Sequence, residues 1–191
     1  MKSKIAIFAS GSGTNAEEII KYFKHHEHIK VALILSNNPN AYVLQRAEKH
    51  QIPHYVFTRE ILYKEKLVDE VLRLNGINFI VLAGFMWLMP ERFVKNYPNK
   101  IVNIHPALLP KYGGKGMYGS HVHEAVVQNK EKESGITIHW VNEEYDKGNV
   151  IFQTTCKISA SDTPEDVANK VHKLEYEHYP KIIEKVIMES Y

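Results

Sequence analysis

The sequence is poor in cysteine, in net charge and in long apolar runs, and each shortage excludes a class of protein. Its one cysteine, Cys156, rules out an intramolecular disulfide framework and a CxxC metal site, and it favours a reducing compartment. With 24 Lys and Arg against 22 Asp and Glu, the net charge of +2 gives no reason to expect a nucleic-acid partner. The longest apolar run, residues 79–89, is too short for a membrane span, which needs about 20 residues.

The rest of the composition is typical of a globular protein. Hydrophobic residues make up 44% of the 191 and charged residues 24%. This length fits one domain with one core, so we predict a single domain over residues 1–191. The first apolar stretch, residues 5–9, is too short for a secretory signal, and we expect a cytoplasmic protein. We also expect small-molecule partners, neither nucleic acid nor membrane, and a monomer or weak homodimer.

Apolar runs typical of strands alternate with stretches of helical periodicity. Strands are predicted at residues 5–9, 31–35, 55–57, 77–83, 101–105, 136–141 and 150–158. Helices are predicted around residues 16–23, 42–50, 67–76, 90–97 and 122–126, with a last helix from Thr163 that Pro180 kinks or splits. This alternation predicts an α/β fold, a Rossmann-like, mainly parallel sheet with helices on both faces. Residues 136–141 alternate between polar and apolar, which predicts an antiparallel or edge strand.

A glycine-rich turn lies between the first predicted strand and the first predicted helix. It reads Gly11-Ser12-Gly13-Thr14-Asn15. The N-terminus of a helix offers free N–H groups, and glycines let an anion approach the backbone closely. Hydroxyl and amide side chains add further donors. The turn therefore predicts a phosphate site, and a plain capped turn is the alternative.

The same turn has two further features. Thr14 and Glu17 have the spacing of a capping box. The glycine spacing also matches dinucleotide-binding folds, which place an acidic residue at the end of the second strand to hold a ribose. Here that strand is followed by Ser36-Asn37-Asn38, which contains no acid. The dinucleotide interpretation is therefore disfavoured.

Asn103 and His105 stand two apart in a predicted strand that Pro106 ends, so their side chains share a face. An amide and an imidazole side by side donate hydrogen bonds to one developing oxyanion, and the histidine also moves a proton. Asp146, in the loop between the last two strands, would raise the pKa of His105 by favouring imidazolium. The alternatives are hydrogen-bonded polar residues at a strand end and a solvated acidic turn, and the sequence leaves both open.

Other polar residues point less clearly to a function. His121 and His123 lie two apart on a predicted helix, so they do not share a face as zinc ligands at i and i+4 do. We expect no metal site. Lys111 and Lys115 lie in a glycine-rich loop, which is either a mobile lid or a flexible surface loop.

Several segments together resemble a known family. They are, in order, Gly11-Ser12-Gly13-Thr14-Asn15, Leu82-Ala83-Gly84-Phe85-Met86, Asn103-Ile104-His105-Pro106-Ala107-Leu108-Leu109-Pro110 and the loop of Asp146. Over essentially the whole chain this arrangement resembles the phosphoribosylglycinamide formyltransferases, folate-dependent enzymes of purine synthesis. The segment from Asn103 is shared with other folate-dependent formyltransferases and a formyl hydrolase, whereas the glycine-rich turn suits a phosphorylated acceptor.

The resemblance implies a role for each matching residue. The acceptor would be held by Gly11, Ser12, Gly13, Thr14 and Asn15 at its ribose phosphate, and by Glu175 at its glycinamide. Folate would contact Met86, Trp87, Leu88 and Met89 in a pterin pocket, and also Asn103, Asn142 and Asp146. The catalytic residues would be Asn103, His105 and Asp146. In that scheme Asn103 and His105 stabilise the oxyanion, His105 acts as general acid, and Asp146 holds His105 protonated.

The implied reaction moves a formyl group from the co-substrate 10-formyltetrahydrofolate to the amine of phosphoribosylglycinamide, without a metal. The alternatives are a formyltetrahydrofolate hydrolase, in which water replaces the amine, transfer to initiator methionyl-tRNA, and a non-catalytic phosphate-binding module. The hydrolases carry an extra N-terminal domain and the tRNA enzymes a C-terminal one. We expect neither here, because the first strand begins by Ile5 and the chain ends after its last helix.

The sequence also departs from the family pattern. Trp87 stands where the family often has arginine, and the loop 111–119 is longer than the common form. A family arginine that meets the folate tail has no clear counterpart in residues 61–66. We expect these differences to affect tail binding and lid closure, and to leave the chemistry unchanged.

Overall fold

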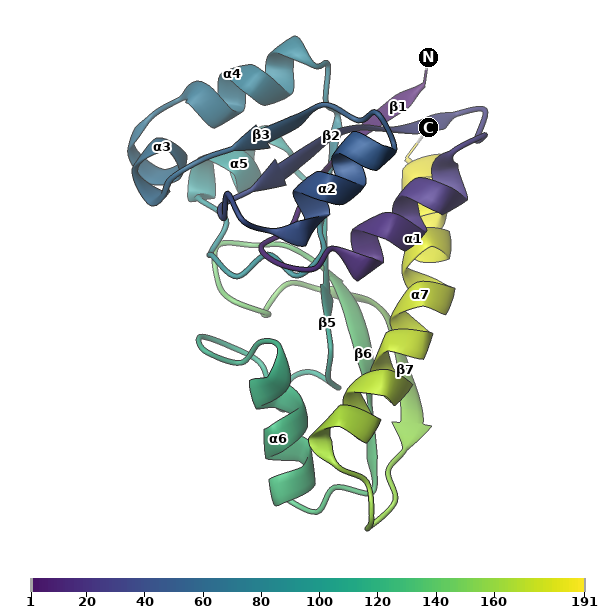
Figure 1. Cartoon of the computed structure of the whole chain (residues 1–191). Helices are drawn as coiled ribbons and strands as arrows, with labels where there is room; N and C mark the ends of the chain where they lie inside the picture. The colour runs from purple at the N-terminus through teal and green to yellow at the C-terminus, as the bar shows by residue number, and fades with distance from the viewer. Residues whose placement is uncertain (1, 191) are drawn as a thin grey trace.

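The computed structural model describes residues 2–190, which form a seven-stranded sheet with helices packed against it (Figure 1). The strands are β1 (Ser3–Phe8), β2 (Ile29–Ser36), β3 (His54–Val56), β4 (Phe79–Leu82), β5 (Ile101–His105), β6 (Glu133–Trp140) and β7 (Val150–Lys157). The helices are α1 (Thr14–Phe23), α2 (Tyr42–Lys49), α3 (Arg59–Lys64), α4 (Leu67–Leu74), α5 (Glu91–Asn96), α6 (Ser120–Gln128) and α7 (Pro164–Met188).

The order of the strands confirms the predicted α/β architecture. The sheet runs β3-β2-β1-β4-β5-β6-β7, and its first five strands are parallel. β6 is antiparallel to β5, and β7 is antiparallel to β6, as the alternation in residues 136–141 predicts. Because parallel neighbours share a direction, the loops after β1, β2, β4 and β5 emerge at one edge of the sheet.

The sheet is buried on both faces, which explains the unbroken apolar runs of its central strands. In β1, Ile5 and Ile7 pack in a core with residues of α1, α2, α6 and α7. Ala6 and Phe8 point the other way, into a second core with residues of α3, α4 and α5. All four side chains are fully buried, and each large one contributes roughly 1.5–3 kcal/mol to the free energy of unfolding.

The start of α1 corrects one expectation. Thr14 is the first helical residue and the N-cap is Gly13, with no side-chain capping bond. The predicted capping box of Thr14 and Glu17 is therefore wrong. The reason is that the backbone enters the helix through a left-handed glycine, which leaves the first N–H groups of α1 without a side-chain acceptor.

The C-terminal helix corrects another. The capping box of Thr163 and Asp166 is present, but α7 runs through Pro180 without a break. Tyr179 is fully buried, and its hydroxyl donates to the carbonyl of Leu82 at 2.8 Å. Packing of this stretch against the sheet outweighs the backbone hydrogen bond that a proline removes. Within residues 2–190, neither α7 nor any other helix is long and apolar enough to span a membrane.

Candidate active site

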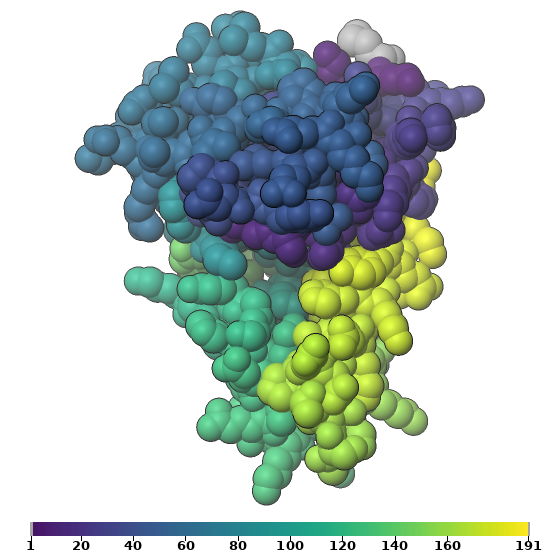
Figure 2. All heavy atoms as spheres, in the orientation of Figure 1, coloured from purple at the N-terminus to yellow at the C-terminus, as the bar shows by residue number. Residues whose placement is uncertain are grey.

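A cavity of about 610 Å³ opens at the edge of the sheet where β1, β2, β4 and β5 end. Figure 2 shows the surface hollowed between the N-terminal part, in purple and blue, and the C-terminal part, in green and yellow. The predicted residues that line this cavity are Gly11, Ser12, Gly13, Thr14, Asn15, Met86, Trp87, Asn103, His105, Asp146 and Glu175. Segments that lie far apart in the sequence therefore meet at one place.

Three residues expected around folate lie outside this lining. Met89 is only 2% exposed and packs in the second core. The backbone N–H of Leu88 donates to the hydroxyl of Tyr145 at 2.9 Å, and Tyr145 itself lines the cavity. Asn142 accepts a hydrogen bond from the backbone N–H of Glu144 within its own loop. Leu88 thus supports the wall through Tyr145, and in residues 86–89 only Met86 and Trp87 line the cavity.

The glycine-rich turn, residues 11–15, is called the anion loop below. Gly13 has φ +69°, and a Cβ built on it would lie 2.5 Å from Cγ2 of Val43, so only glycine fits there. The backbone N–H groups of residues 12–15 have no acceptor among the residues that the structure describes. Unpaired N–H groups at the start of a ten-residue helix are a favourable arrangement for binding an anion.

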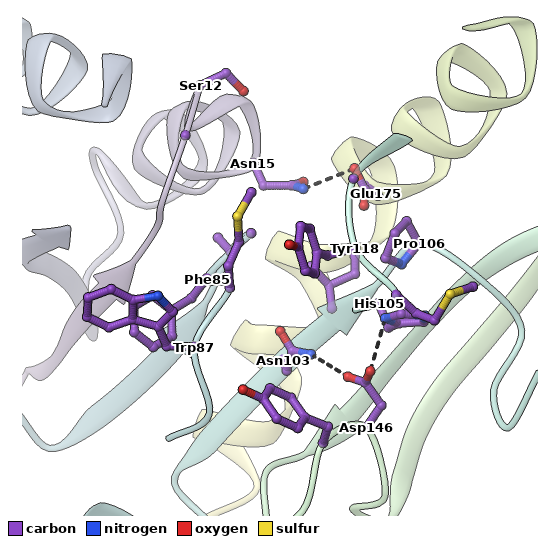
Figure 3. Close-up of a pocket in the computed structure, with 18 of the residues that line it drawn as sticks. Ser12, Asn15, Phe85, Trp87, Asn103, His105, Pro106, Tyr118, Asp146 and Glu175 are labelled. Carbon is purple, nitrogen blue, oxygen red and sulfur yellow. Dashed lines mark hydrogen bonds and ion pairs between the residues drawn. The ribbon is translucent and has the colours of Figure 1, made fainter. Parts of the chain in front are cut away.

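Asn103, His105 and Asp146 meet in the cavity beside β5 (Figure 3). His139 contacts Asn103, and these four residues are called the polar cluster. Oδ2 of Asp146 lies 3.5 Å from Nδ1 of His105, and Oδ1 lies 3.5 Å from Nδ2 of Asn103. The backbone N–H of Gly114 donates to Oδ2 of Asp146 at 2.9 Å. Asp146 has φ +53°, a left-handed conformation that aspartate tolerates. This backbone conformation directs the carboxylate of Asp146 toward β5.

His139 belongs to this cluster although the sequence did not single it out. It lies directly opposite Asn103 in the β5–β6 ladder and is 2% exposed. Its Nδ1 lies 2.8 Å from the carbonyl of Trp140, which only accepts, so Nδ1 carries the proton. Nε2 lies 3.1 Å from the side-chain nitrogen of Asn103 and 3.6 Å from Oδ1 of Asp146. His139 thereby sets which way the amide of Asn103 points. Only the pairing register of the two strands reveals this contact.

The ionisation of the cluster differs from the expectation. Burial lowers the pKa of His105 below its ordinary value of 6.5, although Asp146 and the carbonyl of Tyr112 act to raise it. Asp146 therefore contributes with the predicted sign, but the predicted rise in the pKa of His105 is wrong, because burial outweighs that charge. Burial opposes ionisation of Asp146 too, but His139, His105 and the Gly114 N–H together hold its pKa below the usual range. At neutral pH the cluster holds a carboxylate beside a mostly neutral imidazole.

Glu175 lies at the other side of the cavity, on α7. It is 4% exposed, and its Oε2 accepts from the side-chain amide of Asn15 at 3.0 Å (Figure 3). Nδ1 of His172 lies 2.7 Å from the same oxygen, and this contact raises the pKa of His172. Glu175 thus ties α7 to the start of α1 and brings an acidic group next to the anion loop.

Two histidines on α6 occupy different environments. His123 lines the cavity and is 4% exposed, and burial lowers its pKa. His121 is exposed, and its Nδ1 lies 3.3 Å from the carbonyl of Gly116. Among residues 2–190, no three His, Cys, Asp or Glu side chains are grouped so that they could hold a metal ion.

Arg59 supplies a cation that sequence reasoning missed. It lines the cavity, and its guanidinium lies 5.2 Å from the ring centre of Tyr63 and 5.7 Å from that of Trp87. Residues 61–66 contain no arginine, whereas Arg59 is the first residue of α3, a helix that the sequence analysis did not predict. The N-cap residue Thr58 was the available signal, since its side chain accepts from the backbone N–H of Ile61.

Comparison with known proteins agrees with this geometry. The Formyl transferase family model matches residues 3–183. The phosphoribosylglycinamide formyltransferase of Bacillus subtilis is 36% identical over 189 residues, which cover 96% of this chain and 94% of that protein. The chloroplastic enzyme of that name from Arabidopsis thaliana is 38% identical over 95% of this chain, which spans 64% of its length. The crystal structure of phosphoribosylglycinamide formyltransferase from Bacillus halodurans superimposes with a TM-score of 0.88 at 36% identity, covering 99% of this chain and 97% of that one. The chain belongs to the formyl transferase family.

Proposed function

We propose that this chain transfers a formyl group from 10-formyltetrahydrofolate to the amine of phosphoribosylglycinamide, a step of purine biosynthesis. The observation that carries the proposal is the single cavity lined both by the anion loop and by Asn103, His105 and Asp146 of the polar cluster. One end suits a phosphorylated acceptor, and the other suits the chemistry of a formyl group. The relatives that bear this enzyme's name support the same substrates.

The two substrates fit different walls of the cavity. The phosphate of the acceptor binds the free N–H groups of residues 12–15, and Glu175 meets the glycinamide end. The folate lies along Met86 and Trp87, which form the largely apolar wall that a pterin requires. Arg59, beside Trp87, pairs with the carboxylates of the folate tail. This placement brings the amine and the formyl group together at the polar cluster.

The chemistry needs an amine close to an activated formyl carbon and a donor for the oxyanion that forms. Holding both reactants in one site supplies a large part of the acceleration. The amide of Asn103, oriented by His139 at 3.1 Å, donates to the oxyanion. The carbon–nitrogen bond to the acceptor then persists while the bond to the folate nitrogen breaks.

A proton must leave the attacking amine, and one must reach the folate nitrogen as it departs. Because its pKa is lowered, His105 is neutral and able to accept the first proton. The carboxylate of Asp146, 3.5 Å away, stabilises the imidazolium, which then protonates the leaving nitrogen. In the structure Nε2 of His105 donates to the carbonyl of Tyr112 at 2.7 Å. Proton transfer through Nε2 therefore requires the loop 111–119 to release this bond.

A labelled formyl group tests the proposal directly. With 10-formyltetrahydrofolate labelled at the formyl carbon, we expect the label on the glycinamide nitrogen of the acceptor and no free formate. Free formate, independent of added acceptor, would indicate a hydrolase. Retention of the label on folate would indicate a non-catalytic module and overturn the proposal.

A further inference from the structure

The anion loop is held from behind by α2. The backbone N–H of Val43 donates to the carbonyl of Gly11 at 3.2 Å. Nε of Arg46, one turn further along α2, donates to the carbonyl of Ser12 at 2.8 Å. Neither Val43 nor Arg46 lines the cavity. Two successive carbonyls of the loop are therefore fixed by groups that lie outside the substrate site.

These contacts determine where the N–H groups of the loop point. In a trans peptide the C=O and the N–H of one unit point in opposite directions. When α2 holds the carbonyls of Gly11 and Ser12, the N–H groups of Ser12 and Gly13 point away from α2, and neither has an acceptor in the described residues. A cation on the carbonyl also polarises the amide, so its N–H becomes a stronger donor.

Arg46 is itself fixed by a buried carboxylate. Its Nη1 lies 3.3 Å from Oε2 of Glu17, whose side chain is 6% exposed. The other oxygen of Glu17 pairs with Nε2 of His50 at 3.0 Å, and the ring of Tyr42 packs 4.9 Å from the guanidinium. Burying a carboxylate is costly unless a charge accompanies it, and neither Glu17 nor Arg46 lines the cavity. The ion pair of Glu17 and Arg46 therefore does not contact substrate directly, and its role is to hold the protein structure or to position the anion loop.

We propose that Arg46, held by Glu17, is a positioning residue that orients the N–H group of Gly13 toward the phosphate of the acceptor. This inference rests on the proposed function, because it takes the anion loop as the phosphate site. Arg46 acts through the backbone and touches neither substrate. It adds affinity for the acceptor without taking part in the formyl transfer.

The loop cannot be tested through Gly13, because any Cβ there would collide with Val43. Arg46→Ala is the better probe. We expect its KM for the acceptor and its Kd for inorganic phosphate to rise about tenfold. This is the effect of losing one charge-assisted hydrogen bond worth ~1.4 kcal/mol, here the bond from the N–H of Gly13 to the phosphate. We expect kcat and the KM for folate to change less than twofold. In 15N-resolved NMR spectra, the shift of the Gly13 amide on adding phosphate becomes smaller.

Two further variants separate positioning from general stability. Arg46→Lys keeps the charge but loses the fork of donors, so it restores only part of the phosphate affinity. Glu17→Gln keeps a polar partner for His50 but removes the charge that holds Arg46, and we expect the phosphate Kd to rise again. Lys49→Ala is the matched control. Lys49 also lies near Glu17, at 3.7 Å, but it is 70% exposed, and we expect no change in phosphate affinity.

Each outcome decides one claim. If wild-type protein shows no shift of the Gly13 amide with phosphate, the proposed phosphate site itself fails. If wild type binds phosphate and the variants Arg46→Ala, Arg46→Lys and Glu17→Gln bind it equally well, the positioning role is wrong and the proposed function stands. If Arg46→Ala does not fold, the other two variants carry the test. A parallel loss of kcat and folate affinity would indicate general disruption and contradict the inference.

Discussion

The polar cluster and the anion loop, the two ends of one cavity, are built in opposite ways. In the cluster, the side chains of Asn103, His105 and Asp146 all contact other protein groups. In the anion loop, the N–H groups of residues 12–15 find no partner in the described part of the chain. Under the proposed function, the phosphate of the acceptor supplies the partners that the loop lacks, whereas the residues of the cluster exchange hydrogen bonds that they already make. Changes in the cluster should alter turnover, and changes behind the loop should alter affinity.

The strongest test of this contrast is Asp146→Asn. The amide keeps the size of the side chain but removes the charge that stabilises imidazolium, so we expect kcat to fall by about a hundredfold or more. Substrate KM values should change much less. The same substitution should also change the pKa of His105 in one direction only. Burial lowers the pKa of His105 and Asp146 acts to raise it, so without Asp146 the pKa should fall further below 6.5.

Histidine ring NMR across a pH series measures that pKa in both proteins. In Asp146→Asn the imidazole signal of His105 should titrate at lower pH than in wild type. An unchanged or raised pKa would show that Asp146 does not act through its charge. The mostly neutral His105 would then need another source of stabilisation when it accepts a proton.

Asn103→Ala should have the next largest effect. Removing one donor to an oxyanion commonly costs about a hundredfold in turnover. We expect the fold to survive, because the side chain of Asn103 belongs to neither core, although the residue lies in the middle of β5. Steady-state kinetics and thermal unfolding check both statements. Asn96→Ala, at an exposed position on α5, is the control and should keep wild-type turnover. If Asn103→Ala fails to fold, Asn103 has a purely structural role instead.

The sequence predicted the sheet and the meeting of these two regions well, for a physical reason. Strands buried on both faces leave unbroken apolar runs such as residues 79–83, and those runs locate most of the sheet. Since parallel strands end at one edge, the loop after β1 and the end of β5 had to lie near each other. The cavity confirms that Gly13, Asn103 and His105 line one space.

The features that the sequence did not predict depend on contacts between segments that lie far apart in the chain. The contact of His139 with Asn103 follows from the register of β5 against β6, which no local pattern reveals. The pKa of His105 depends on how deeply the ring is buried, and that outweighed the nearby charge that the sequence did suggest. Pro180 indicated a kink or a split, and packing of α7 against the sheet lets it continue through Pro180 as one helix.

Arg59→Ala should produce a smaller and more selective effect than the changes in the cluster. If its guanidinium meets the folate tail, the KM for folate should rise about tenfold, ~1.4 kcal/mol, with kcat and the acceptor KM unchanged. Arg59 is exposed, so salt should screen the contact and reduce the difference between variant and wild type. Arg73→Ala removes an arginine that is 71% exposed on α4 and serves as control. An equal rise in the KM values for folate and for the acceptor would contradict a specific contact between Arg59 and the folate tail.

The smallest expected change is spectroscopic and concerns Trp87. Its ring is partly buried among Phe57, Phe85 and Tyr63, and it also lines the cavity next to Arg59. A folate analogue that covers this wall displaces water from the indole, so its emission should change on binding. Trp140, the second tryptophan, lies in β6 and must be removed first. In a Trp140→Phe background we expect emission to change with added folate analogue, and inorganic phosphate, which binds at the other end of the cavity, should leave it unchanged. If Trp87 only packs the core, neither ligand will change the signal, and the folate wall must then be sought on another side of the cavity.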